Sequence, residues 1–327
     1  LIVIVIVIVT VIVIVTVIVI VIVIAIVLVI VIVNVIVTVI VIFIVIVISI
    51  LSLFFIIFSV FYINSNNLKY GLEFSGGTEV IIDFYEEVDI DSLRERVSFI
   101  SNIDSTVQLY DKNNYLIKFP FDQKTEFNVK DKLGKVFKEF YSDLNPNIVQ
   151  IDFIGPKVGK ELVQNGLMAI IYGSIAILIY VFIRFNISFS IAAVFALFHD
   201  FLISLFFISF LNIEITLSTI AAILTVIGYS VNDTIVIFDR VRENLLNTKS
   251  EFTETINISI VQTLSRTILT VITVLIVLIP LYFFGGPILR DFSLIMIIGV
   301  IIGTYSSILF APYLMYIFSS RRINKNG

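Results

Sequence analysis

The stretch TLSTIAAILTVIGYSVNDTIVIFDR, from Thr216 to Arg240, is apolar over a membrane length and still contains Asn232 and Asp233. About 20 apolar residues form a helix long enough to cross the hydrocarbon core of a bilayer. A carboxylate at that depth costs about 2.5 to 3.5 kcal/mol on the insertion scale. Asp233 is therefore expected to face a partner or a hydrated cavity, and proton or ion pathways are the usual reason for such a residue.

The composition of the whole chain is typical of a membrane protein. Hydrophobic residues make up 59% of the 327 residues and charged residues only 14%, which excludes an ordinary soluble globular protein. The formal net charge is −4 and no basic block is present, so nothing indicates a nucleic-acid partner. Cysteine is absent, and the fold therefore uses no disulfide bonds.

Six apolar stretches predict six transmembrane helices. The first is Ile42–Tyr62, and the other five lie at about residues 166–185, 187–211, 216–238, 264–284 and 292–317. The basic residues of two connections and of the tail are Arg184, Arg240, Arg242, Lys249, Arg321, Arg322 and Lys325. By the positive-inside rule this side is cytoplasmic. We therefore expect both termini in the cytoplasm, with residues 164–318 as a five-helix membrane domain and 319–327 as a cytoplasmic tail.

Residues 1–41 are a low-complexity repeat in which Val and Ile alternate. The exceptions, such as Thr10 and Asn34, each differ from Ile or Val by one nucleotide, as in an eroded nucleotide repeat. A strand of this composition would be apolar on both faces, and a helix reaching to Tyr62 would be about 90 Å long against about 30 Å of hydrocarbon. We interpret the tract as an artefactual or dispensable repeat; one or two extra spans are the alternative.

Residues 63–163 are rich in charges and predict a small domain between the first and second helices, on the extracytoplasmic side. The expected elements, in order, are a strand at Gly77–Phe84, a helix at Asp91–Ile100 capped by Asp91, strands in STVQLYD and YLIKF, a helix within Thr125–Tyr141 and a strand at Asn147–Gly155. The order βαββαβ predicts a ferredoxin-like α+β domain. The fold class is thus a mainly α membrane protein with one ferredoxin-like domain.

Several ionisable residues lie inside the predicted spans and form the candidate site. His199 and Asp200 fall near the centre of the third span, Asp233 lies in the fourth, and Arg266 lies near the cytoplasmic start of the fifth. Asp233 and Arg266 could form a proton site or a static salt bridge. His199 and Asp200 could equally be a structural pair. The charged residues Asp239 and Arg240 are interpreted as anchors at the membrane boundary.

Two glycine motifs are expected to be structural. Gly299 and Gly303 form a GxxxG face, which favours close helix packing. The segment SGGT, from Ser75 to Thr78, lacks the Lys and the strand–loop–helix order of a phosphate loop, so it predicts a tight turn. No HExxH motif is present, and the single His lies inside the membrane. Nothing therefore indicates a hydrolase, a bound metal or a cofactor.

The motifs of the chain also resemble a known family. The matching stretches are EFSGGTEV, IGPKVGKEL, HDFLIS, TLSTIAAILTVIGYSVNDTIVIFDRVREN, VQTLSRTILT and FGGPILRDF followed by GTYSSILFAP. In this order, between about Leu68 and Met315, they are similar to the SecF proteins of the SecD/SecF family, which assist the bacterial Sec translocase. The long motif in the fourth span is the most specific. Residues 1–41 depart from the family, which has a short N-terminus.

The resemblance implies a fold of the resistance-nodulation-division superfamily and a place in the bacterial cytoplasmic (inner) membrane. It implies a SecD partner, association with the SecYEG channel and its auxiliary subunit, and promotion of preprotein export started by SecA with the proton gradient. It also implies that Asp233 binds the proton and Arg266 is its cationic counterpart, with supporting residues Asn232, Thr234, His199, Asp200, Asp239 and Arg240. Two other classes remain open: half of a proton-driven exporter of small molecules or lipids, and a passive scaffold.

Overall fold

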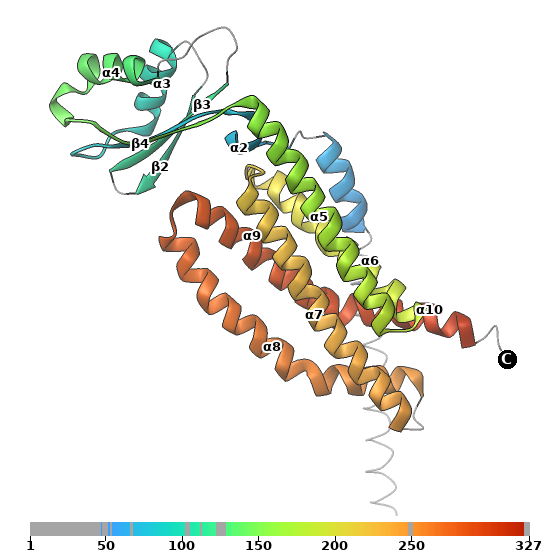
Figure 1. The fold of residues 1–327 in the computed structure, drawn as a ribbon. Coiled ribbons are helices and arrows are strands. Elements are labelled where there is room, and N and C mark those ends of the chain that lie inside the picture. The colour runs from blue at the N-terminus through green and yellow to red at the C-terminus, as the bar shows by residue number, and fades with distance from the viewer. Residues whose placement is uncertain are drawn as a thin grey trace, which may run out of the picture. The chain divides into compact units, whose positions relative to one another are not determined.

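A computed structural model shows a mainly helical protein with one small β-sheet (Figure 1). It describes residues 47, 52, 54–65, 68–101, 105–111, 113–121, 129–247 and 251–323. Residues 1–51 and residues 52–327 form two separate units, and the second contains the sheet and the long helices. The repeat tract at residues 1–41 lies outside the described residues, as does much of the predicted first helix.

Four antiparallel strands form the sheet in the spatial order β2-β3-β1-β4. They are β1 (Gly77–Asp83), β2 (Thr106–Asp111), β3 (Asn114–Pro120) and β4 (Asn147–Ile154). Helix α3 (Ile90–Ser101) connects β1 to β2, and α4 (Val129–Phe140) lies between β3 and β4. Both helices lie on one face of the sheet (Figure 1). The strands and helices follow each other in the predicted order.

The core of this domain forms where the alternating apolar residues of β1 and β3 meet α3 and α4. Val80 and Ile82 from β1 and Tyr115 from β3 have no exposed surface. The Tyr115 hydroxyl satisfies both polar groups of one residue, because it donates to the Val88 carbonyl and accepts from the Val88 N–H, each at 2.7 Å. Removing these apolar side chains from water is the main force that stabilises the domain.

The predicted cap of the first helix in this domain was wrong by two residues. Asp89, not Asp91, caps α3, because its Oδ2 accepts a hydrogen bond of 2.9 Å from the Ser92 N–H. Asp91 lies inside the first turn and forms an exposed ion pair with Arg94 at 2.8 Å. A cap residue must precede the helix with extended backbone, and the helix begins at Ile90.

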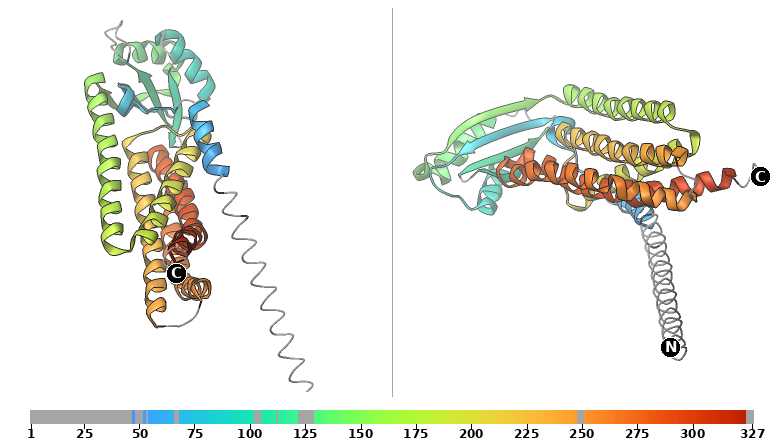
Figure 2. Two further views of the ribbon diagram at one scale, coloured as in Figure 1. Left: turned by 90° about the vertical axis from the view of Figure 1, so that its right-hand side faces the viewer. Right: turned by 90° about the horizontal axis from the view of Figure 1, so that it is seen from below.

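Five helices of the described part are long and apolar enough to cross a membrane: Pro156–Arg184, Ile187–Phe210, Leu217–Asn247, Phe252–Phe284 and Gly286–Ser319. They correspond to α5, α6, α7, α8 and the run from α9 (Gly286–Tyr305) into α10 (Ala311–Ile323). A shorter apolar helix at Phe54–Ser65 overlaps the predicted first span. The long helices run side by side in both further views (Figure 2).

The ends of these helices differ from the predicted spans where capping decides them. Helix α5 begins at Pro156 rather than near Gly166, because Gly155 is its cap and proline is suited to the first helical position. Helix α7 begins at Leu217 because the Thr216 hydroxyl accepts from the Thr219 N–H at 3.2 Å. The Glu73 carboxylate accepts from the Leu217 N–H at 2.6 Å and adds a negative charge at the positive end of α7.

Helix α7 is central and α5 and α8 are peripheral. In the most apolar window of each span, 56% of α7 and 61% of α6 are buried, against 11% for both α5 and α8. Helix α7 packs against α5, α6, α8 and α9. Its 31 residues make it about 46 Å long, so its charged end extends beyond about 30 Å of hydrocarbon.

The last predicted span is not one continuous α-helix. A π-helical turn, η2 (Ser306–Phe310), separates α9 from α10. Before this turn, Gly299 and Gly303 bring α9 close to α7, since a Cβ on Gly303 would lie 3.0 Å from the Ser230 Cβ and one on Gly299 would overlap Val226. The prediction of close packing at this glycine pair is confirmed. Turns of this type are frequent at functional sites.

Candidate functional site

Asp233 lies in the middle of α7 and is 7% exposed. The Asn232 side chain and the charge of Arg266 on α8 both act on its carboxylate. Among the described residues, no direct ion pair joins Asp233 and Arg266. Arg266 itself is exposed on the surface of the described unit. The two predicted residues therefore interact electrostatically without a direct ion pair.

A second acid, Asp200 on α6, lies in a fully buried polar cluster. Its Oδ1 is 2.7 Å from Nδ1 of the neighbouring His199, and neither residue has any exposed surface. Its Oδ2 accepts hydrogen bonds from Ser230 on α7 and, at 2.7 Å, from Ser306 of the π-helical turn. Asp200 thus holds three helical elements together through a single carboxylate.

The π-helical turn also contacts the part of α7 that contains Asp233. The Ser307 hydroxyl donates to the Ser230 carbonyl at 3.0 Å and lies 3.0 Å from the Thr234 hydroxyl. Thr234 follows Asp233 directly in the chain and is 1% exposed. The predicted residues His199, Asp200 and Thr234 are therefore brought together by two serines of the turn.

Three functional candidates were missed in the sequence: Ser230, Ser306 and Ser307. The available signal was weak, because single serines are common in membrane helices and usually bond to their own backbone. The pair in GTYSS was the better clue, since it follows Gly303 at the face that packs closely. Only the contacts with Asp200 and Thr234 distinguish these hydroxyls from ordinary helix serines.

The charges at the end of α7 form a boundary network. Arg184, the last residue of α5, lies 2.7 Å from the Asp239 carboxylate, and Arg242 lies 3.9 Å from it. Arg240 pairs with Glu243 at 2.9 Å on the exposed surface. Asp239 and Arg240 are thus separate from the Asp200 cluster, and their placement fits the interpretation as anchors.

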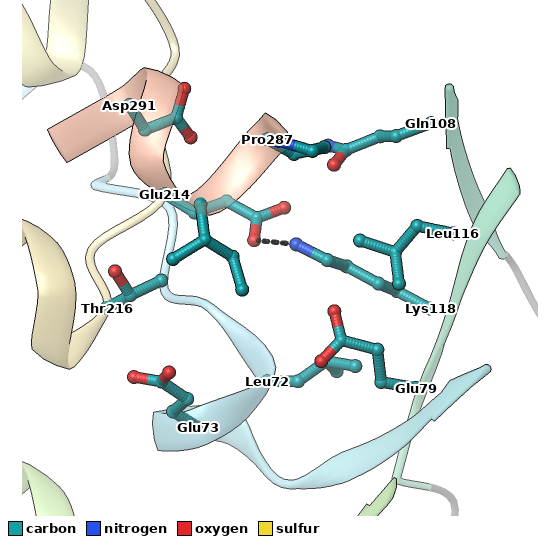
Figure 3. A pocket seen from close by; sticks show the side chains of 11 residues that line it. Leu72, Glu73, Glu79, Gln108, Leu116, Lys118, Glu214, Thr216, Pro287 and Asp291 are labelled. Carbon is teal, nitrogen blue, oxygen red and sulfur yellow. Dashed lines mark hydrogen bonds and ion pairs between the residues drawn. The ribbon is translucent and has the colours of Figure 1, made fainter. Parts of the chain in front are cut away.

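A cleft lies where the open face of the sheet meets the connection between α6 and α7 and the start of α9 (Figure 3). Its lining residues are Leu72, Glu73, Glu79, Gln108, Leu116, Lys118, Glu214, Thr216, Pro287, Ile288 and Asp291. Lys118 on β3 pairs with Glu214 at 2.7 Å. Three further acids, Glu73, Glu79 and Asp291, also line the cleft (Figure 3).

Burial raises the pKa of Glu79 above its ordinary value of 4.5, although the Lys118 charge opposes the shift. The nearby acids Asp152, Glu73 and Glu214 raise the pKa of Glu79 further. This cleft was not predicted, because its charged residues come from distant parts of the chain. Within the described ranges, no group of three or more His, Cys, Asp or Glu residues is placed to hold a metal ion.

The long helices contain buried titratable side chains: His199, Asp200 and Asp233. Buried carboxylates and one imidazole can change charge, and a change of charge at a buried group alters which helix contacts are favourable. The SGGT segment forms the predicted tight turn, in which Gly76 and Gly77 have φ values of 78° and 153° where α2 (Leu72–Ser75) leads into β1.

Comparison with known proteins gives the same family throughout. Residues 132–321 match the family described as "Protein export membrane protein SecD/SecF, C-terminal". The protein translocase subunit SecF of Calditerrivibrio nitroreducens is 37% identical over 275 residues, covering 82% of this chain and 90% of that protein. The SecF subunit of Rickettsia felis is 36% identical over 277 residues, covering 84% and 90%.

Solved structures agree with these relatives. The crystal structure of SecDF from Thermus thermophilus, a translocon-associated membrane protein, matches with a TM-score of 0.73 and 32% identity. The match covers 84% of this chain and 37% of that chain. A structure of SecDF in a super-membrane-facing form matches with a TM-score of 0.64 at 32% identity. The family model, the relatives and the solved structures therefore agree, and the chain belongs to the SecD/SecF family of protein export membrane proteins, among its SecF members.

Proposed function

We propose that this chain is a subunit of the Sec protein-export machinery that uses the proton gradient, together with a SecD partner, to promote preprotein translocation. The observation that carries the proposal is Asp233, a carboxylate that is 7% exposed in the middle of an apolar helix. Such a residue is costly in a membrane helix and is retained where charge has to move.

The electrostatics of Asp233 suit a proton carrier. A direct ion pair with Arg266 would favour the carboxylate strongly, whereas the desolvation of a buried site favours the neutral acid. At Asp233 the charge of Arg266, which acts without a direct ion pair, favours the carboxylate, and desolvation opposes it. Proton uptake would then remove a charge from the interface of α7 and α8 and allow the two helices to repack.

The proposed architecture has six transmembrane helices, with the sheet domain as a ferredoxin-like extracytoplasmic domain and both termini in the cytoplasm. The apolar helix at Phe54–Ser65 supports a sixth span that begins near Ile42. The largely exposed apolar surfaces of α5 and α8 suit contact with lipid or with the helices of a partner. The matched region is 37% of the SecDF chain. We propose that a separate SecD partner corresponds to the remainder of that chain.

The name SecDF of the matched structures supports a SecD partner, and the other partners belong to the proposed role. The proposed partners are SecD, the SecYEG channel and its auxiliary subunit, and the preproteins that SecA drives into the channel. Residues 1–41 are proposed to be dispensable. A gene that lacks them should complement a SecF-depleted strain, and failure despite normal membrane levels of the protein would contradict this.

The function is tested by Asp233→Asn, which is nearly isosteric and cannot titrate. The variant should insert and bind SecD, but it should lose the gradient-dependent gain in export. Export is measured in inverted vesicles with and without a proton gradient and normalised to assembled complex. Thr225→Val is a matched control on α7, because the Thr225 hydroxyl bonds, within the described part of the chain, only to the Ala221 carbonyl of its own helix. A full gradient-dependent gain in Asp233→Asn would refute the proposal.

Arg266→Lys separates a proton site from a static salt bridge. Lysine keeps the charge but loses the planar set of donors, so partial loss of the gradient-dependent gain is expected. A static role for Asp233 and Arg266 predicts the reverse pattern: lower protein levels in both variants and normal export per assembled complex.

A further inference from the structure

The His199 and Asp200 pair has a hydrogen-bond pattern that defines its protonation. Oδ2 of Asp200 accepts hydrogen bonds from Ser230 and Ser306, and Oδ1 lies 2.7 Å from Nδ1 of His199; a carboxyl oxygen with two donors is suited to the ionised carboxylate. Ser230 and Ser306 each supply a hydroxyl proton. Nδ1 of His199 must then carry its own proton, since the carboxylate has none to give.

The other ring nitrogen of His199 is the acceptor of the pair. Nε2 is buried and has no hydrogen-bond partner among the described residues. With the proton on Nδ1, Nε2 has a free lone pair, so the pair has a charge of −1 in a region without exposed surface. A buried charge without compensation is unfavourable.

Aromatic rings lie beside the imidazole. The Phe310 ring lies 4.8 Å from the imidazole, centroid to centroid, at an interplanar angle of 30°. An aromatic face attracts a cation at this distance. The ring of Tyr305, on α9, lies 5.7 Å from the imidazole, and Asp233 lies three residues beyond Ser230 on α7; both are titratable groups of elements that pack against α6.

We propose that His199 is a second proton-binding site, distinct from Asp233, which takes one proton at Nε2 and compensates the Asp200 carboxylate. The proton comes from the gradient, the Nε2 lone pair forms the new N–H bond, and the charge of the pair changes from −1 to 0. Loss of the net charge weakens the hydrogen bond from Ser306 to Asp200. The π-helical turn is then less firmly fixed against α7. This role in export rests on the proposed function, whereas proton binding itself does not.

The chain contains a single histidine, so its ring can be observed alone. Full-length protein labelled with ring-¹⁵N histidine in lipid bilayers is studied by solid-state NMR between about pH 5 and pH 8, the range in which His usually changes charge. We expect a neutral ring with the proton on Nδ1 at the upper end and an imidazolium at the lower end. A proton on Nε2 at the upper end, or a spectrum that does not change, would overturn the proposal.

Two variants separate this site from Asp233. Asp200→Asn removes the compensating charge, so the imidazolium should no longer form in the same range. Asp233→Asn should leave the His199 spectrum and its titration in place. If Asp200→Asn titrates as the parent protein does, Asp200 does not support the charge and the proposal fails.

The export arm uses His199→Asn, whose amide N–H replaces Nδ1–H but whose side chain cannot take a proton. Gradient-dependent export should fall several-fold at normal abundance and SecD association, with a changed dependence on external pH. Unchanged export would overturn the role in transport. If Asp233→Asn keeps its gradient-dependent gain while the His199 ring titrates as expected, the proposed function fails and the proton site stands.

Discussion

Lys118 and Glu214 are 96 residues apart in the chain, and Nζ of the lysine lies 2.7 Å from Oε2 of the glutamate. The bond joins β3 of the sheet domain to the connection between α6 and α7. The two side chains are 16% and 23% exposed, so water screens the pair less than it would a surface pair. Next to it, the Ile215 N–H donates to the Lys69 carbonyl at 2.8 Å and the Gly71 N–H donates to the Ile215 carbonyl at 2.9 Å.

Lys118→Met should loosen this junction, because Glu214 would then face Glu79 and Asp291 without the lysine charge. A hydrogen bond to a charged group contributes about 1.5 to 3 kcal/mol, so the amides near Ile215 should exchange about tenfold faster or more. Hydrogen–deuterium exchange of the full-length protein measures this. The exchanged pair Lys118→Glu with Glu214→Lys should restore protection. Lys157→Met, at an exposed position of α5, is the control and should change nothing.

Glu79→Gln should remove a pH dependence of stability. The pKa of Glu79 is raised in the fold, so the folded state holds the proton more tightly than the unfolded chain. The stabilising contribution is complete below pH 4.5, the ordinary value, and is lost as the pH rises through the higher folded pKa.

The Gln variant should therefore be more stable than the parent at neutral pH, and the difference should vanish in acid. Unfolding temperature across a pH series measures this, with Glu95→Gln at an exposed position of α3 as the control. Equal slopes in the parent and the Glu79→Gln protein would contradict the buried position of this carboxyl.

Gly299→Ala should weaken the contact of α9 with α7, because the added methyl group would overlap Val226. Overpacking of this kind costs about 1 to 3 kcal/mol. Val226→Ala should offset part of the loss in the double variant. Gly228→Ala on α7 is the matched control, since no atom of the described residues, apart from its chain neighbours and its own helix backbone, lies within 4 Å of its added Cβ. Thermal stability of the purified protein is the measurement, and equal losses at both glycines would refute the packing argument.

The proposed topology predicts opposite labelling of two sites. The chain has no native cysteine, so Asn113→Cys and Thr248→Cys introduce single thiols. An impermeant thiol reagent should label Asn113→Cys in intact cells and Thr248→Cys only in inverted vesicles. Asn113 lies in the turn between β2 and β3, and Thr248 lies outside the described residues. Labelling of Thr248→Cys from outside would exclude the six-helix arrangement.

Local pattern was enough to predict the class of protein, five of the spans and the order of the strands and helices in the sheet domain. Hydropathy over about 20 residues and the periods of helix and strand are properties of neighbouring positions, which the sequence contains directly. The same holds for Asp233, whose cost in an apolar helix marks it without any knowledge of its neighbours.

Tertiary structure decided which polar groups meet. Asp200 acquires Ser230 and Ser306 only because α9 approaches α7 at its glycines and then changes to a π-helical turn. Lys118 and Glu214 meet only because the open face of the sheet lies against the connection between α6 and α7. Each of these contacts joins residues far apart in the chain, and a hydrogen bond requires an approach of about 3 Å, which depends on how the packed helices and the sheet fit together. No local pattern in the sequence contains that distance.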